Sequence, residues 1–185
     1  MFESIIDPTI GPASATDRPR PRLAGRPESL SGLRLGLLAN TKRNAEQFIA
    51  DVGAELARQY GVVPVLATKK PNIVETAPAE IMAELTAQCD VVVVGVGDCG
   101  SCSASAVADG IILEQSGIPA VVVCTDAFTA SADAMAGLRG APGYRYLTVP
   151  HPMANLTPDG VRDRACAAVP GIVGMLTRRA MAAAS

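Results

Sequence analysis

Two cysteines stand three residues apart in the segment VVVVGVGDCGSC, Val91 to Cys102, directly after a run of four valines. If a helix begins there, Cys99 and Cys102 are separated by about one helical turn. A cysteine at a helix N-terminus is favoured as a thiolate, because free backbone N–H groups and the helix dipole stabilise negative charge. The pattern predicts a nucleophilic or redox-active Cys99, with Cys102 resolving a sulfenic acid or mixed disulfide formed on Cys99.

The same segment is also compatible with nucleotide binding. Gly95, Gly97 and Gly100 form a G-x-G-x-x-G pattern between an apolar run and a helical pattern, and Asp126 is a candidate for binding a ribose. Three features argue against this hypothesis. The motif follows the third expected strand instead of the first, Asp126 lies farther away than the usual ~20 residues, and a cysteine side chain would crowd the pyrophosphate.

Two other interpretations assign the cysteines no redox role. Packing as small buried hydrophobic residues explains Cys102 more easily than Cys99, which lies between the polar Asp98 and a glycine. Zinc binding needs further ligands, and the nearby candidates are Cys124 and His151, with no second CxxC to complete a tetrahedral set. We therefore expect neither a metal ion nor a bound cofactor at this loop.

The elements that position this loop follow from the alternation of short apolar runs and longer helical patterns after residue 33. The expected strands are 34–39, 62–67, 90–96, 119–125 and 145–150, and the expected helices are 44–60, 79–88, 103–115, 127–138 and 158 onward. This order predicts an α/β protein: a single Rossmann-like or flavodoxin-like three-layer domain over 31–185, with a mainly parallel sheet of about five strands. Residues 1–30 are rich in Pro, Arg, Ser and Gly without a sustained period, and predict an extended arm.

Polar residues follow the expected strands at their carboxyl ends, where open α/β sheets bind ligands. The candidates are Asn40, Lys42, Arg43 and Asn44 after the first strand, Asp98, Gly100 and Ser101 around Cys99, Thr125 after the fourth strand, and His151 after the fifth. Histidine exchanges protons near neutral pH, so we expect His151 to deprotonate Cys99 or to protonate a leaving group. The alternative for His151 is to cap a loop.

Cationic residues near these strand ends have different expected roles. Lys42 and Arg43 lie at an expected helix N-terminus, where positive charge is unfavourable, and this indicates binding of a substrate carboxylate or phosphate. Their alternative is a solvated first helical turn. Lys69 and Lys70 follow an expected edge strand and are predicted to be ordinary surface charge.

The remaining cysteines are expected to be structural. Cys89 precedes a strand at the end opposite to the candidate site, and Cys166 lies on an apolar helix.

Composition excludes several other classes of protein. A content of 49% hydrophobic and 18% charged residues is typical of a globular domain. The chain has no Trp and a net charge of −2, so it offers few stacking platforms and no overall attraction for nucleic acid or anionic lipid. No apolar segment reaches the roughly 18 residues that a membrane span needs. Five cysteines and no recognisable signal sequence predict a cytoplasmic location.

The run GVGDCGSCSASAVADGIILEQSGIPAVVVCTDAF, with GLLANTKRNA after the first strand and VPHP after the fifth, resembles the UGSC-motif family of selenoproteins and their cysteine homologues. The resemblance extends from about Leu33 to Leu156. It implies a Rossmann-like domain with a redox-active or nucleophilic chalcogen at position 99, where relatives commonly carry selenocysteine. Relatives often have an aromatic residue and a His in the following helix, where this chain has Ser105 to Ala108, which leaves His151 as the only histidine.

These observations predict a cysteine-dependent enzyme that acts on a small anionic organic molecule. Regeneration through Cys102 or an external thiol or dithiol favours a reductase or thiol-exchange enzyme. The alternatives are a cofactor-free cysteine lyase or isomerase, in which Cys102 would be dispensable, and a dinucleotide-binding module. We also expect the chain to form a homo- or hetero-oligomer, without nucleic acid or a membrane as a partner.

Overall fold

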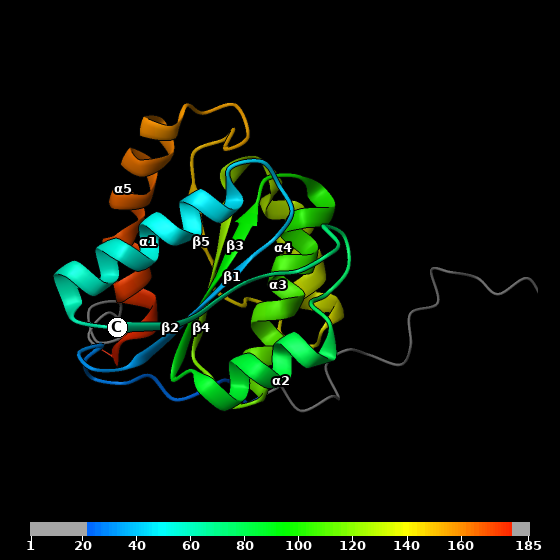
Figure 1. Ribbon diagram of the computed structural model, residues 1–185. Helices are drawn as coiled ribbons and strands as arrows, with labels where there is room; N and C mark the ends of the chain where they lie inside the picture. Colours follow the sequence, from blue (N-terminus) through cyan, green and yellow to red (C-terminus); the bar gives the residue numbers. More distant parts are fainter. Residues whose placement is uncertain (1–21, 179–185) are drawn as a thin grey trace, which may run out of the picture.

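Helices cover both faces of a five-stranded sheet in the computed structural model, which describes residues 22–178 (Figure 1). The elements are β1 (Arg34–Ala39), α1 (Ala45–Tyr60), β2 (Val63–Lys69), α2 (Ala79–Gln88), β3 (Val91–Gly97), α3 (Gly100–Gln115), β4 (Ala120–Thr125), the 3-10 turn η1 (Asp126–Phe128), α4 (Thr129–Leu138), β5 (Leu147–Val149) and α5 (Pro158–Leu176). Helices α1 and α5 pack on one face, and α2, α3 and α4 pack on the other. The predicted three-layer α/β domain is confirmed.

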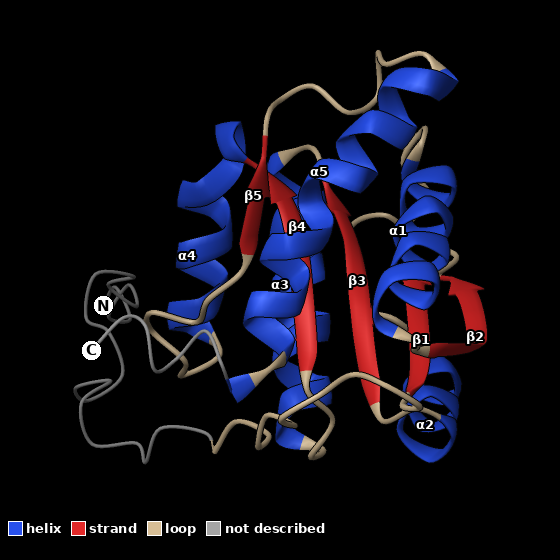
Figure 2. Cartoon of the chain, turned by 90° about the vertical axis from the view of Figure 1, so that its left-hand side faces the viewer, coloured by secondary structure: helices blue, strands red, loops and turns tan. Residues whose placement is uncertain are grey.

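All strand pairs are parallel, and the strand order is β2-β1-β3-β4-β5. Figure 2 shows the strands side by side in this order. This is the flavodoxin-like order, in which the chain reverses direction across the sheet between β1 and β3. Loops that follow β1 and β3 therefore meet at the carboxyl edge of the sheet. None of the helices within 22–178 is long and apolar enough to cross a membrane.

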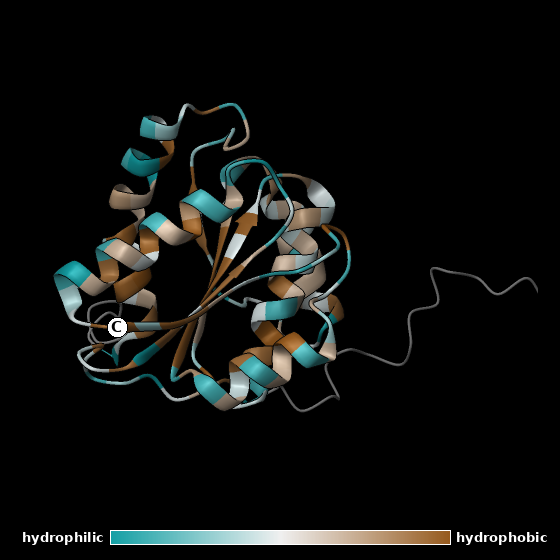
Figure 3. Ribbon diagram, in the orientation of Figure 1, coloured by the Kyte–Doolittle hydropathy of each residue, from teal (hydrophilic) through white to brown (hydrophobic). Residues whose placement is uncertain are grey.

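The uniformly apolar strand β3 supplies both cores. Because side chains alternate along a strand, Val91 and Val93 join the cluster beneath α1 and α5, whereas Val92 and Val94 join the cluster beneath α2, α3 and α4. Figure 3 shows the strands as mainly hydrophobic and the hydrophilic residues of the helices turned largely outward. A strand buried on both faces explains why its sequence shows no alternation.

Local signals account for most element boundaries, and the start of α3 differs most from the prediction. Helix α5 begins after Thr157, whose side chain accepts the Gly160 N–H, and α1 ends at Gly61 in the left-handed conformation with φ 67°. Helix α3 begins at Gly100, three residues before the predicted start at 103, because Cys99 acts as its N-cap.

The last part of the predicted arm contacts the domain. Residues 1–21 lie outside the described residues, but Leu30 is buried and Arg26 forms an ion pair with Glu114 near the end of α3. Arg26 also donates from Nε to the Met175 carbonyl at the end of α5, at 2.8 Å. This segment therefore lies at the amino edge of the sheet, away from Cys99.

Candidate dithiol site

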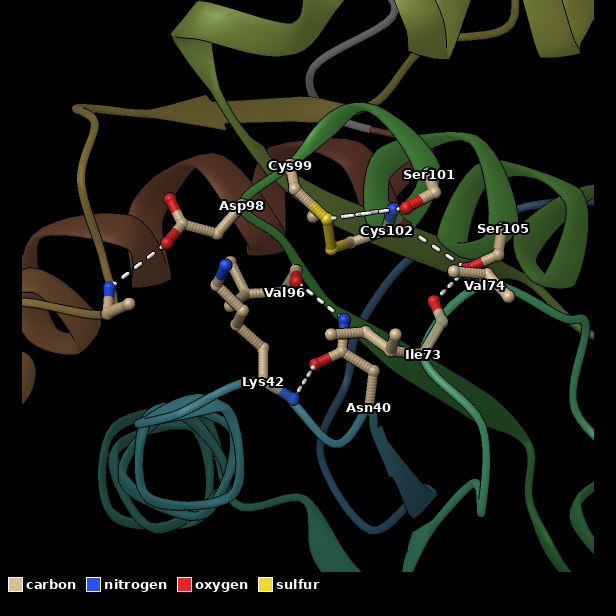
Figure 4. The surroundings of a disulfide bond; sticks show 12 residues. Asn40, Lys42, Ile73, Val74, Val96, Asp98, Cys99, Ser101, Cys102 and Ser105 are labelled. Atoms are coloured by element: carbon tan, nitrogen blue, oxygen red, sulfur yellow. Dashed lines mark hydrogen bonds between the residues drawn. A yellow bond between two sulfur atoms is a disulfide. The ribbon is translucent and has the colours of Figure 1, made fainter.

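Cys99 and Cys102 are joined by a disulfide at the start of α3 (Figure 4). Their Cα atoms lie 5.1 Å apart, within the usual range for a disulfide. The Cys102 N–H donates to Sγ of Cys99 at 3.2 Å, so the sulfur of Cys99 takes the place of a helix-capping oxygen. Cys102 is buried and Cys99 is half-buried. Cys99 is therefore the sulfur more open to another molecule.

Close packing beneath the disulfide requires glycine at position 97. A Cβ at Gly97 would lie 2.7 Å from Sγ of Cys124 and 2.7 Å from Cα of Ser103. Both distances are too short for van der Waals contact, so a larger residue would push the first turn of α3 away from β4. The second glycine of the GxGxxG pattern thus serves helix packing in this fold.

Asp98 is a buried carboxylate that holds the loop after β5. Oδ1 of Asp98 accepts from Nδ1 of His151 at 2.9 Å and from the Met153 N–H at 3.1 Å, and Oδ2 accepts from the Ala154 N–H at 3.0 Å. A carboxylate in contact with Nδ1 favours the tautomer with its proton on Nδ1. The other ring nitrogen, Nε2, is then the one able to accept a proton.

The imidazole of His151 is held by further contacts. Nδ1 lies 3.3 Å from Oγ1 of Thr125, which in turn donates to the Gly97 carbonyl at 3.2 Å. The ring meets Phe128 edge-on, with centroids 5.3 Å apart. The side chain stays 37% exposed, and Nε2 has no hydrogen-bond partner within residues 22–178. The ring is thus oriented on its Nδ1 side and open on its Nε2 side.

Asp126, the candidate ribose-binding acid, is engaged elsewhere. Its Oδ1 accepts the backbone N–H of His151 at 3.0 Å. A dinucleotide would also meet the Asp98 carboxylate at the turn where the pyrophosphate has to bind, and like charges repel. The contacts of both carboxylates argue against a nucleotide site here.

Two asparagines after β1 tie the surrounding loops together. Nδ2 of the buried Asn40 donates to the Val96 carbonyl at 2.7 Å. Asn44 adopts a left-handed conformation with φ 70°, and its Nδ2 donates to the carbonyls of Met153 and Leu156, both at 3.0 Å. These amides join the loop after β1 to β3 and to the loop after β5, so both have a positioning role in the structure.

Lys42 brings positive charge to the same edge of the sheet. Its backbone N–H donates to Oδ1 of Asn40 at 3.0 Å, and Figure 4 shows its side chain extending toward the Asp98–Cys99 segment. The side chain is half-buried and forms no salt bridge with any carboxylate of residues 22–178. The neighbouring Arg43 is exposed.

Gly100 and Ser101 complete the start of α3. A Cβ at Gly100 would lie 3.2 Å from Oγ of Ser131 on α4, which leaves little room for a larger residue. Ser101 is exposed, and its Oγ lies 3.6 Å from Sγ of Cys99. The Ser101 hydroxyl is therefore close enough to interact with a thiolate at Cys99.

The prediction that Lys70 is surface charge is wrong. Lys70 is 2% exposed, and its Nζ contacts Oδ2 of Asp109 at 2.7 Å, Oγ of Ser105 at 2.9 Å and the Glu75 carbonyl at 2.8 Å. Lys69 is exposed, as predicted. After β2 the chain turns across the carboxyl edge of the sheet and buries Lys70 against α3. The signal in the sequence was Asp109 on an apolar helix, because a buried carboxylate needs a partner.

The other three cysteines differ from one another. Cys89 is buried, and burial raises its pKa; burial raises the pKa of Cys124 to about 12. The structural role predicted for Cys166 is wrong, because its side chain is exposed on α5. Among residues 22–178, no three His, Cys, Asp or Glu side chains are grouped as metal ligands would be.

A pocket of about 660 Å³ lies apart from the cysteines. Its lining includes Leu30, Tyr60 at the end of α1, and Val173 and Thr177 near the end of α5. These residues lie at the amino edge of the sheet, and the lining includes no cysteine or histidine. We place the candidate site at the dithiol, because the reactive groups converge there.

The fold and site define a flavodoxin-like α/β domain with a CxxC disulfide at the carboxyl edge of its sheet. The chain belongs to the UGSC family, whose profile matches residues 4–178. None of the curated proteins matches it. Among solved structures, the crystal structure of RecJ in complex with Mn2+ from Thermus thermophilus is similar at 17% identity, with a TM-score of 0.38. The match covers 78% of this chain and 19% of that chain, so this protein spans about a fifth of RecJ.

Proposed function

We propose that this protein is a thiol–disulfide oxidoreductase that acts on a small anionic molecule with an electrophilic sulfur. The observation that carries the proposal is the Cys99–Cys102 disulfide at the N-terminus of α3, with the more open sulfur on Cys99. Reduced Cys99 would be stabilised as a thiolate by the Cys102 N–H and by the helix dipole. Membership of the UGSC family is compatible with this redox role.

The reaction needs two thiol exchanges. The Cys99 thiolate attacks one sulfur of a substrate disulfide, an S–S bond forms, and the other half of the substrate leaves as a thiolate. Cys102 then gives its proton to solvent and attacks Sγ of Cys99, which restores the protein disulfide and releases the second half of the substrate as a thiolate. The substrate gains two electrons, and an external thiol or dithiol, abundant in a reducing cytoplasm, returns two electrons to the protein.

The proposed proton donor to the first leaving group is His151. Asp98 holds Nδ1, which leaves Nε2 for proton exchange with a molecule bound at the same edge of the sheet. The charge of Lys42 supports an anionic substrate, because no carboxylate of residues 22–178 neutralises its ammonium group. Arg43 adds a second cation next to it in the sequence.

The test uses 5,5′-dithiobis(2-nitrobenzoate), an anionic disulfide that releases a coloured thiolate. The exposed Cys166 is first replaced in a Cys166→Ser background, so that only the dithiol reacts under native conditions. The reduced protein should release about two coloured thiolates per chain and keep no adduct, because Cys102 displaces the first mixed disulfide.

Single-cysteine variants provide the controls. Cys102→Ser should release about one thiolate and retain a mixed disulfide on Cys99, detectable by mass spectrometry. Cys99→Ser should lose the fast phase without loss of the fold, as monitored by circular dichroism. A Cys102→Ser variant that released two thiolates per chain and kept no adduct would contradict the proposal, because Cys102 would then be dispensable, as it is in the lyase or isomerase alternative.

A further inference from the structure

A buried ion pair lies beneath the helix that carries the dithiol. Nζ of Lys70 and Oδ2 of Asp109 are 2.7 Å apart, and both side chains are almost completely buried, at 2% and 0% exposure. Asp109 also accepts the Ala77 N–H at 2.8 Å through Oδ1. Burial raises the pKa of Asp109, and Lys70 opposes that shift. The pair fastens the 70–77 loop to α3.

Ser105 connects this pair to the dithiol. Its Oγ contacts Nζ of Lys70 at 2.9 Å. The same Oγ lies 3.2 Å from the Cys102 carbonyl and 3.0 Å from the Ile73 carbonyl (Figure 4). Two consecutive contacts through Ser105 therefore connect the ammonium group of Lys70 to the backbone carbonyl of the buried Cys102.

The two charges stand in a fixed order along α3. Ser105 follows Cys102 by three residues, about 4.5 Å along the helix axis, and Asp109 follows by seven, about 10 Å. Lys70 contacts both, so the ammonium group is nearer to the dithiol than the carboxylate is. The contact with Ser105, whose hydroxyl lies against the Cys102 carbonyl, puts the positive end of the pair on the side of the dithiol, in a region of low effective dielectric constant.

A contribution to fold stability does not explain well why an ion pair is buried here, because replacing a buried ion pair by apolar residues is often neutral or stabilising. An electrostatic effect on the cysteines explains it better. Reduction of the disulfide adds two electrons, takes up one proton, and leaves Cys99 as a thiolate and Cys102 as a thiol. The negative charge that forms is favoured by a nearby cation.

We propose that Lys70 is a positioning residue that, held by Asp109 and Ser105, shifts the Cys99–Cys102 couple toward the reduced dithiol. This inference rests on the proposed redox function. According to this inference, Lys70 in the loop after β2 influences the reduction potential of the dithiol without contacting the substrate. Asp98, Lys42 and the imidazole of His151 also face the dithiol edge, and they stay unchanged in the variants below.

The experiment is a redox titration of the Cys166→Ser protein in glutathione buffers at pH 7, with mass spectrometry of alkylated samples. Two glutathione molecules supply the electrons and form their own disulfide. Lys70→Met should shift the equilibrium about threefold toward the protein disulfide, because the nearer cation is lost. Asp109→Asn should shift it about threefold the other way, because the cation then acts without its counter-charge.

Opposite signs separate an electrostatic effect from a loosened structure, which would move both variants in one direction. Equal shifts in the same direction, or no shift in either variant, would overturn the inference. Lys69→Met removes a neighbouring exposed charge and should leave the equilibrium unchanged. If circular dichroism shows that Lys70→Met does not fold, Asp109→Asn decides alone: a shift toward the dithiol supports the inference, and any other result overturns it.

The titration does not require turnover. A measurable glutathione equilibrium with the predicted shifts, in a protein that fails the test with 5,5′-dithiobis(2-nitrobenzoate), would leave this inference standing and remove the proposed function. Normal activity together with an unchanged redox equilibrium in both variants would support the proposed function and overturn this inference. The two hypotheses therefore fail on different measurements.

Discussion

Cys99 differs from Cys89, Cys124 and Cys166 in combining the two properties that govern thiol reactivity, which are exposure of the sulfur and stabilisation of the thiolate. It is half-buried at a helix N-terminus, where the Cys102 N–H donates to its sulfur. Cys89 and Cys124 are buried, and burial raises their pKa values. Cys166 is exposed but lies within α5, where no free N–H groups stabilise a thiolate. Reactivity should therefore follow position in the fold.

Iodoacetamide provides the measurement at this scale. At pH 7.5, after reduction, we expect Cys99 to be alkylated first, then Cys166, with Cys89 and Cys124 much slower because their thiols stay protonated. Peptide mass spectrometry of a time course gives the order. Alkylation of Cys99 more slowly than Cys166 would show that the helix N-terminus does not activate it, and a denatured sample controls for digestion.

The start of α3 is the element on which the site depends. β3 brings Gly97 against Ser103 and Cys124, and the chain then turns through Asp98 and Cys99 into the helix. The turn leaves no room for a side chain at position 97. Its geometry is thus coupled to the packing between β3, α3 and β4.

Gly97→Ala tests this coupling. The added methyl group would overlap Ser103 and Cys124, so we expect the free energy of unfolding to fall by about 1–3 kcal/mol, measured by urea denaturation. The reaction of Cys99 with iodoacetamide should also slow, because the helix start is displaced. The matched control is Gly137→Ala within α4, where nothing lies within 4 Å, and where we expect a gain of about 0.5–1 kcal/mol.

At the scale of the whole molecule, one buried ion pair joins the amino-terminal segment to the end of α3. Arg26 forms two contacts with Glu114, at 2.7 Å and 2.8 Å, and Glu114 also accepts the N–H groups of Ala24 and Ala120. Glu114 is fully buried and Arg26 is 15% exposed. Removal of one partner would leave a charge without compensation in the interior.

Arg26→Met should lower the free energy of unfolding by about 3–5 kcal/mol in urea denaturation, because Glu114 would lose its cation while staying buried. The control is Arg58→Met, which removes the exposed pair with Glu55 and should leave stability unchanged within error. An equal effect of the two substitutions would show that burial of Glu114 carries no special cost. Since Arg26 lies far from the dithiol edge, the redox equilibrium of the cysteines should not move.

The sequence was sufficient for the architecture because the signals for it are local. Apolar runs and helical periodicity predicted five strands alternating with helices, and the structure confirms this α/β arrangement. The rule for carboxyl ends also predicted that residues after β1, β3, β4 and β5 would share one edge. The contacts of Asn44, Asp98 and Thr125 follow from that convergence.

Tertiary structure decided which partner each polar group has. Nothing local in the sequence indicates that Asp98 holds His151 or that Asp126 is bonded to a backbone N–H. Asp109 on an apolar helix indicates a buried partner, but nothing local identifies that partner as Lys70. Hydropathy and periodicity assign a residue to an element and a face, whereas a hydrogen bond or buried ion pair depends on the position of a second chain segment in space. The position of the CxxC at the start of a helix could therefore be predicted from the sequence, and the contacts around it only from the fold.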